Sequence, residues 1–170
     1  QAFARNRPDV LALLGDRFEM HAAAVASLPF RIPLAHIGGG DSTEGAFDES
    51  LRHSITKMSH LHFAFTAQSA QRIVQMGEEP WRVTISGAPS LDNLQDTVWL
   101  SRGEIEERFG LSLEIPPLLV TCHPVTLECE DTEWQVNELL MALDEAENPV
   151  VFTYPNADTR GRGIVHLIDP

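Results

Sequence analysis

The stretch that decides the fold is AHIGGGDSTEGAFDESLRHSITKMSHLHF, residues 35–63. It continues an apolar strand pattern that begins at 32, and then passes through three consecutive glycines into acidic residues. A helical pattern follows over 47–60, with apolar side chains recurring on one face. A second apolar strand begins at 61. A strand, a glycine-rich loop, a helix and a further strand predict a parallel β-α-β unit.

The same alternation extends outward in both directions. Strands are predicted at 9–15, 32–37, 61–65, 82–87 and 149–154, and one more after the double proline at 116–117. Helices are predicted at 18–28, 68–76 and 130–146, with Ser90 capping a short one. Ser101 and Glu104 form a capping box. We predict an α/β protein with parallel sheets, divided into regions 1–100 and 101–170.

Composition limits the possible partners. Acidic residues outnumber basic ones by 25 to 12, which gives a net charge of −13 and argues against a nucleic-acid binder. A nucleotide ligand remains compatible, because local arginines and backbone N–H groups can hold phosphate. Cys122 and Cys129 are the only cysteines, and they favour a cytoplasmic protein with reduced thiols. No apolar run approaches the roughly 20 residues of a membrane span, so no membrane association is expected.

Polar clusters follow four of the predicted strands, at 15–17, 36–45, 121–124 and 154–158. Ligands bind beyond the carboxyl ends of parallel strands, so the clusters are candidates for a shared cleft. Singly, each has an ordinary explanation. Asp16 could belong to a common Gly-Asp turn, His36 could be a satisfied core histidine, and His123 could cap the next turn.

Asp48 and Arg52 are four residues apart and lie on one face of a helix. The pair could be a surface salt bridge worth a few tenths of a kcal/mol. At the mouth of a cleft it could instead hold a sugar phosphate or tune a carboxylate. His60 and His62 could ligate a metal, but structural roles are favoured, and no metal site is predicted.

Five motifs in this order carry a family resemblance: GDRFEMHAAAVA (15–26), HIGGGDSTEGAFDESLRHSITKMSHLHF (36–63), SGAPSLDNL (86–94), LVTCHPVT (119–126) and VVFTYPNAD (150–158). They resemble the UDP-N-acetylglucosamine 2-epimerases, most closely the hydrolysing branch that serves sialic and related nonulosonic acid synthesis. The resemblance implies two Rossmann-like domains in a GT-B arrangement, with a nucleotide sugar in the cleft between them. It also implies a homodimer or higher homo-oligomer and no cofactor.

Against that pattern, the chain is expected to be an internal segment, inactive alone. It would hold the latter part of the N-terminal domain (1–100), and a linker with the beginning of the C-terminal domain (101–170). The family's reaction removes the C2 proton of the sugar while UDP leaves C1, giving a 2-acetamidoglucal. The hydrolysing branch adds water to give N-acetylmannosamine and UDP.

The resemblance also assigns roles to individual residues. Asp16 and Asp48 match carboxylates of the acid/base chemistry, and Arg17 and Arg52 match arginines that contact substrate or phosphate. His123 matches a histidine that contacts the nucleotide. Asn156 lies where the family's Pro-Asn turn approaches the nucleotide.

One departure from the family concerns Gly38, where many members have a glutamate. Asp41 or Glu44 could supply the missing carboxylate from the same loop. Gly39 and Gly40 would let the backbone pass close to the sugar, while a mobile loop carries the acids into the site.

Three alternatives to the hydrolysing UDP-N-acetylglucosamine 2-epimerase stay open. One is the non-hydrolysing epimerase, which returns UDP-N-acetylmannosamine. The second is a hydrolysing enzyme for a 2,4-diacetamido-trideoxy hexose on UDP or GDP. The third is a nucleotide-sugar-binding relic without turnover.

Overall fold

The computed structural model describes residues 2–156 and 160–169 and divides the chain into two compact units, Gln1–Thr97 and Val98–Pro170. Each unit contains one parallel sheet. The division falls close to the predicted boundary after residue 100.

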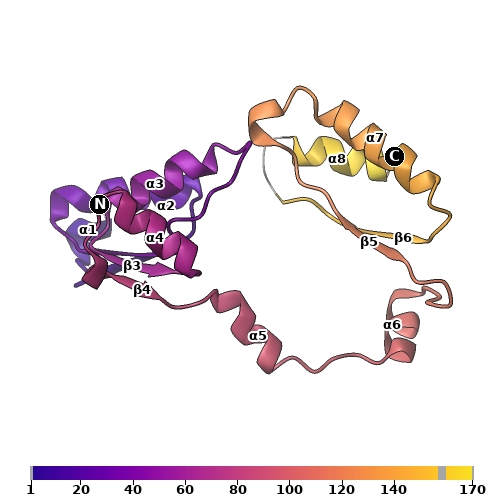
Figure 1. Cartoon of the computed structure of the whole chain (residues 1–170), viewed down its shortest axis with the longest axis horizontal. Helices are drawn as coiled ribbons and strands as arrows, with labels where there is room; N and C mark the ends of the chain where they lie inside the picture. The colour runs from indigo at the N-terminus through magenta and orange to yellow at the C-terminus, as the bar shows by residue number, and fades with distance from the viewer. Residues whose placement is uncertain (1, 157–159, 170) are drawn as a thin grey trace. The chain divides into compact units, whose positions relative to one another are not determined.

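The first unit is built on a four-stranded parallel sheet of order β1-β2-β3-β4. Its strands are β1 (Leu11–Leu14), β2 (Leu34–Ile37), β3 (Leu61–Ala64) and β4 (Val83–Ile85). Strands adjacent in sequence are adjacent in the sheet, so right-handed crossovers place all the connecting helices on one face. These helices are α2 (Phe18–Ser27), α3 (Asp48–Met58) and α4 (Ala67–Gln75), and they lie together on one side of the strands (Figure 1).

The core of the first unit lies between this helical layer and the sheet. Leu13, Ala24, Leu34 and Ile55 form one buried cluster beneath α2 and α3. Ala64, Ala70 and Ile73 form a second cluster beneath α4. The short helix α1 (Ala2–Arg5) precedes β1, and Phe3 packs edge-on against Phe30 at a centroid distance of 6.0 Å.

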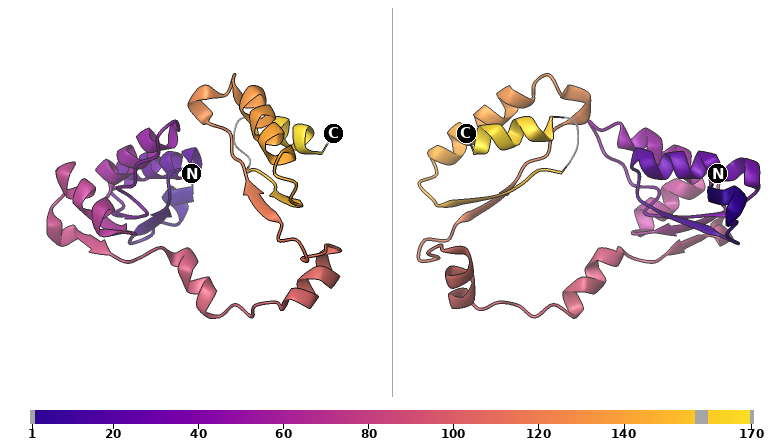
Figure 2. Two further views of the ribbon diagram at one scale, coloured as in Figure 1. Left: turned by 45° about the vertical axis from the view of Figure 1, so that its right-hand side comes forward. Right: turned by 180° about the vertical axis from the view of Figure 1, so that it is seen from behind.

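The second unit has a two-stranded parallel sheet, β5 (Leu118–Thr121) and β6 (Val150–Thr153), paired in register from Leu118 with Val150 to Thr121 with Thr153. Helices α7 (Thr132–Asp144) and α8 (Gly161–Ile168) pack against each other (Figure 2).

The remaining helices of the two units are α5 (Asp92–Gln95), α6 (Arg102–Phe109) and the 3-10 turns η1 (Leu28–Phe30), η2 (Pro80–Arg82), η3 (Pro89–Leu91) and η4 (Thr126–Glu128).

The predicted elements form, with one local error. The capping box of Ser101 and Glu104 is present at the start of α6. Ser90, however, does not cap a helix: it lies inside η3, and the residue that precedes α5 is Leu91, which makes no side-chain cap. The sequence-based assignment was wrong because Pro89 starts a 3-10 turn one residue before Ser90.

Candidate active site

Two loops of the first unit, those after β1 and β2, meet at the carboxyl edge of its sheet. The Gly15 N–H donates to the Ile37 carbonyl at 2.9 Å, and the Gly38 N–H donates to the Phe63 carbonyl at 2.9 Å. These bonds continue the ladder one residue beyond the ends of β1 and β2. The loops that carry Asp16 and Asp41 are therefore held at the same edge, as parallel topology requires.

Arg52 links these loops. The residue is only 6% exposed, and its guanidinium donates from Nε to Asp16 Oδ2 at 2.9 Å and from Nη2 to the same oxygen. Nη1 donates to the Asp41 carbonyl at 3.0 Å, and Nη2 donates to Thr43 Oγ1 at 2.9 Å. One buried cation thus fixes a carboxylate from the β1 loop against the backbone of the β2 loop.

The Asp41 side chain is also held in place. Its Oδ1 accepts from the Ser69 hydroxyl in the first turn of α4, and the Ser69 N–H donates to Thr66 Oγ1 at the N-cap at 3.1 Å. Arg72, on the same helix, donates to the Gly40 carbonyl. These bonds hold the first part of the loop, at Gly40 and Asp41, against α4. The mobility expected of the loop stays a prediction.

The next part of the loop is tied to Glu49. Its Oε2 accepts from the Thr43 N–H at 2.7 Å and from the Ser42 hydroxyl at 3.0 Å. These two bonds lower the pKa of Glu49 below its ordinary value, with the backbone bond contributing most. Glu49 is therefore ionised at neutral pH and serves as the anchor for residues 42 and 43.

Protein atoms lie close to each of the three glycines, at the position that a Cβ atom would occupy. A side chain at Gly39 would place its Cβ 2.8 Å from His36 Nδ1 and from Thr56 Oγ1. Gly40, at φ +83°, faces the Ser69 carbonyl and Ile73, and Gly38, also at φ +83°, faces the Phe65 ring at 2.8 Å. Close packing within the unit therefore accounts for the glycines, and contact of Gly39 and Gly40 with a sugar stays a prediction.

Two hollows open at this edge and share Asp41 and Arg52. The first has a volume of about 370 Å³ and apolar walls; it is lined by Leu14, Gly15, Asp16, Gly38, Asp41, Arg52, Phe65, Pro89 and Ser90. The second has about 470 Å³ and is lined by Asp41, Ser42, Thr43, Arg52, Thr66, Gln68, Ser69 and Arg72. Two carboxylates and a buried cation thus border a space large enough for part of a small ligand.

The other predicted residues of this unit lie around the same edge. Asp48 is the first residue of α3, one turn before Arg52, and is half-buried. Arg17 is exposed and its Nε donates to Glu19 Oε2 at 3.3 Å. Glu44 is exposed. The structure therefore joins Asp16, Asp41 and Arg52 through hydrogen bonds, with Asp48 close by along the chain.

In the second unit the structure joins His123 and Asn156. The Asn156 N–H donates to His123 Nδ1 at 3.2 Å, beyond the carboxyl ends of β5 and β6. The last residues of these strands, Thr121 and Thr153, share a hydroxyl bond of 2.6 Å. Residues 157 and 158 of the predicted polar cluster lie outside the described residues.

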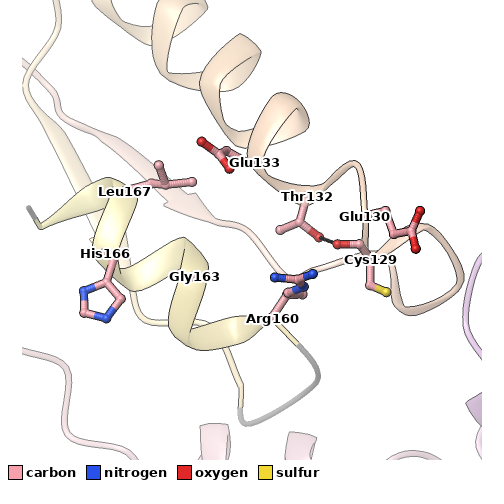
Figure 3. A pocket seen from close by; sticks show the side chains of 8 residues that line it. All are labelled: Cys129, Glu130, Thr132, Glu133, Arg160, Gly163, His166 and Leu167. Carbon is pink, nitrogen blue, oxygen red and sulfur yellow. Dashed lines mark hydrogen bonds between the residues drawn. The ribbon is translucent and has the colours of Figure 1, made fainter.

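A further hollow of the second unit, of about 290 Å³, lies between the start of α7 and α8 (Figure 3). It is lined by Cys129, Glu130, Thr132, Glu133, Arg160, Gly163, His166 and Leu167. Thr132 Oγ1 donates to the Cys129 carbonyl at 3.0 Å, which ties the first turn of α7 to the preceding loop. The predicted nucleotide-contacting residues of this unit are not among its lining residues, so it carries no part of the candidate site.

Sequence reasoning missed Ser69, Arg72 and Phe65. The Thr66–Ser69 pair at a helix start was a usable signal, and Arg72 follows on the same face three residues later. His60 and His62 have structural partners: His60 Nδ1 accepts from the Leu34 N–H at 3.3 Å, and His62 Nε2 lies 3.3 Å from Glu78 Oε2.

Two findings bear on metals and membranes. Among residues 2–156 and 160–169, no three His, Cys, Asp or Glu side chains are grouped so as to hold a metal ion. In the same part of the chain, none of the helices combines the length and apolar character that crossing a membrane requires.

Comparison with known proteins gives a consistent result. The family model described as UDP-N-acetylglucosamine 2-epimerase matches residues 1–169. The GDP/UDP-N,N'-diacetylbacillosamine 2-epimerase (hydrolyzing) of Campylobacter jejuni is 39% identical over 161 residues, which cover 94% of this chain and 42% of that protein. The UDP-N,N'-diacetylbacillosamine 2-epimerase (hydrolyzing) of Legionella pneumophila is 36% identical over 168 residues, covering 99% and 44%.

Among solved structures, Staphylococcus aureus MnaA with UDP superimposes with a TM-score of 0.76 at 20% identity, covering 99% of this chain and 46% of that one. This likeness confirms the predicted α/β fold with parallel sheets. The chain spans less than half of the length of the curated relatives it matches.

Proposed function

Because the chain belongs to the UDP-N-acetylglucosamine 2-epimerase family, we propose that the protein is a hydrolysing nucleotide-sugar 2-epimerase. It eliminates UDP from UDP-N-acetylglucosamine and adds water to the 2-acetamidoglucal, releasing N-acetylmannosamine. The observation that carries the proposal is the bond of buried Arg52 to Asp16, in a hollow that Asp41 also lines. Asp16 and Asp41 are the acid/base groups of this proposal, and the general preference of ligands for the carboxyl edge of a parallel sheet supports it.

The elimination needs a base at C2 and support for the departing diphosphate at C1. Arg52 donates both of its bonds with Asp16 to Oδ2, and the Asp16 side chain is 26% exposed. We therefore assign proton transfer to the other carboxylate oxygen, Oδ1. Asp48 is the second acid/base group, from the first turn of α3. We favour Asp41 over Glu44 as the third carboxylate, because Asp41 lines the hollow.

Charge on the substrate is met by cations and by N–H donors. Arg17, beside Asp16 and exposed, is assigned to the diphosphate. Arg52 already has four bonds within the protein, so its role is to hold Asp16 and the loop, with substrate contact secondary. His123 and Asn156, joined by a 3.2 Å bond, are assigned to the nucleotide.

The test uses the full-length protein with UDP-N-acetylglucosamine in deuterium oxide. Proton NMR should show free N-acetylmannosamine with deuterium at C2, together with UDP. Asp16→Asn and Asp48→Asn should each lower kcat by about 100-fold or more, the range of a lost general acid or base. Asp144→Asn, at the exposed end of α7, is the matched control and should keep full activity.

The products also separate the alternatives. A sugar still joined to UDP would identify the non-hydrolysing reaction. Binding of UDP without its release from any nucleotide sugar would identify a binding protein without turnover. Near-normal kcat in both aspartate variants would reject the assignment of these carboxylates.

A second candidate substrate is a UDP- or GDP-linked 2,4-diacetamido-2,4,6-trideoxy hexose. The Campylobacter and Legionella relatives carry diacetylbacillosamine in their names, and the walls of the hollow include Leu14, Phe65 and Pro89. An apolar wall favours a methyl group over a hydroxymethyl group by about 10-fold or more in kcat/KM. Comparison of the two nucleotide sugars, which differ at both C4 and C6, measures the combined preference, and equal or better use of UDP-N-acetylglucosamine would reject the second candidate.

The cellular location and the oligomeric state of the enzyme are part of the same proposal. A UDP-linked substrate and two free cysteines are in keeping with a cytoplasmic enzyme. We expect a homodimer or higher homo-oligomer of the full-length protein, measurable by light scattering.

A further inference from the structure

His36 lies at the centre of the first sheet and is fully buried, with 0% of its surface exposed. Its Nε2 lies 2.9 Å from the Gly15 carbonyl, in the residue before Asp16. Its Nδ1 lies 3.0 Å from Thr56 Oγ1, on α3 one turn after Arg52. The imidazole therefore joins β2 to both elements that carry the proposed acid/base groups.

The two partners define the protonation state of the ring. A carbonyl oxygen only accepts, so Nε2 must carry a hydrogen and donate it to Gly15. The Thr56 hydroxyl can donate or accept, and in the neutral ring it donates to a bare Nδ1. The neutral Nε2–H tautomer satisfies every polar atom of this buried group.

Burial supports the same state. It lowers the pKa of His36 from its ordinary 6.5, and the Gly15 bond opposes this only in part. The charged or titratable groups that act on the ring are Asp16 from the β1 loop, Arg52 from α3 and His62 from β3. Asp16 raises the pKa, whereas Arg52 and His62 lower it.

Gly39 completes the arrangement. A side chain there would reach within 2.8 Å of both His36 Nδ1 and Thr56 Oγ1. Glycine is thus required where the loop crosses over this hydrogen bond, and the tripeptide after β2 is shaped in part by His36.

We propose that His36 is a positioning residue for Asp16. Its Nε2–H bond fixes the Gly15 peptide, and hence the direction of the adjacent carboxylate, while its bond to Thr56 fixes α3 and Arg52. The consequence for turnover rests on the proposed function. The tautomer and the two hydrogen bonds do not.

The first test reads the ring itself in the full-length protein. Nitrogen-15 NMR of the imidazoles should show His36 as the Nε2–H tautomer at pH 7, with a slowly exchanging ring hydrogen. Thr56→Val removes the donor to Nδ1 and should shift the Nδ1 resonance, whereas the exposed Thr84→Val should not. An Nδ1–H tautomer, or no shift in Thr56→Val, would overturn the proposal.

The second test reads turnover. His36→Gln keeps an N–H donor for Gly15, and His36→Leu keeps none. His36→Leu should lower kcat by about 10- to 100-fold with KM within about twofold, as expected when a reacting group is misplaced. His36→Gln should recover at least half of that loss on a logarithmic scale.

The two tests separate the possible failures. If no nucleotide sugar is turned over, the proposed function fails and the NMR result still decides the tautomer. If turnover is present, and folded His36→Leu and His36→Gln both match the wild type, the positioning role is overturned while the function stands. If His36→Leu does not fold, the turnover of Thr56→Val decides the case, because valine has nearly the same shape as threonine.

Discussion

Replacement of Arg52 by methionine should destabilise the first unit by about 3 kcal/mol. Removing one partner of a buried ion pair costs about 3–5 kcal/mol, because the remaining charge is left uncompensated. Here Asp16 is left with its side chain 26% exposed, so water offsets part of the cost and the lower end applies. The Asp41 carbonyl and the Thr43 hydroxyl lose their donors as well.

Native-state amide exchange is the appropriate assay, because it reports the stability of each unit separately. A chain of two units need not unfold in a single transition. A loss of about 3 kcal/mol should speed exchange of the most protected β2 amides by about 150-fold, at a factor of ten for every 1.4 kcal/mol. Arg52→Lys should fall between wild type and Arg52→Met, because it keeps the charge and loses the planar fork.

The matched control is Arg102→Met in α6. Its guanidinium pairs with Glu106 at 3.2 Å, but the two side chains are 58% and 32% exposed. Such a pair contributes less than about 1 kcal/mol, and β2 lies in the other unit. Adding Asp16→Asn to Arg52→Met should recover stability, because the double variant no longer has an Asp16 carboxylate without a cation beside it. Less than a fivefold change in Arg52→Met would refute the account of Arg52 as the buried link.

Three further outcomes follow from the packing and the titration behaviour. Gly40→Ala should cost about 2–4 kcal/mol, because φ is +83° and the new methyl meets the Ser69 carbonyl. Gly103→Ala in α6, which meets open space, should be neutral or stabilising, and amide exchange within each unit measures both. Burial lowers the pKa values of His36 and His62 below 6.5, so the unfolded chain binds protons that the folded one does not. Stability should fall as the pH drops below about 6.5, and melting between pH 7.5 and 5.5 should show a shallower fall in His36→Gln. Ser101→Ala should cost α6 about 1 kcal/mol through its capping box, seen as faster amide exchange in that helix alone.

Much of the site was open to sequence reasoning because parallel topology is predictable. Polar residues that follow consecutive parallel strands must meet at one edge, and Asp16 and Asp41 do so. What could not be predicted is how they are held. The spacing of Asp48 and Arg52 left open a helix salt bridge or a role at the mouth of a cleft. It gave no sign of the bond between Arg52 and Asp16, which lies 36 residues earlier in the chain.

The loop after β2 shows the same limit. A run of three glycines predicts a flexible connection, since glycine alone carries no information about its neighbours. In the structure Ser69 and Arg72, from a helix formed later in the chain, hold this loop at Asp41 and Gly40. Those partners are brought together by the packing of α4 on β3, which no local pattern encodes.

The amino-acid sequence by itself determined the order of strands and helices, the parallel sheets and the edge at which chemistry can occur. These depend on apolar periodicity and on local turn preferences, which act within a few residues. Only the tertiary structure decided the partners of Arg52, the tautomer of His36 and the need for Gly39. Each depends on atoms from separate elements meeting within about 3 Å, and such distances are set by the register and packing of the whole unit.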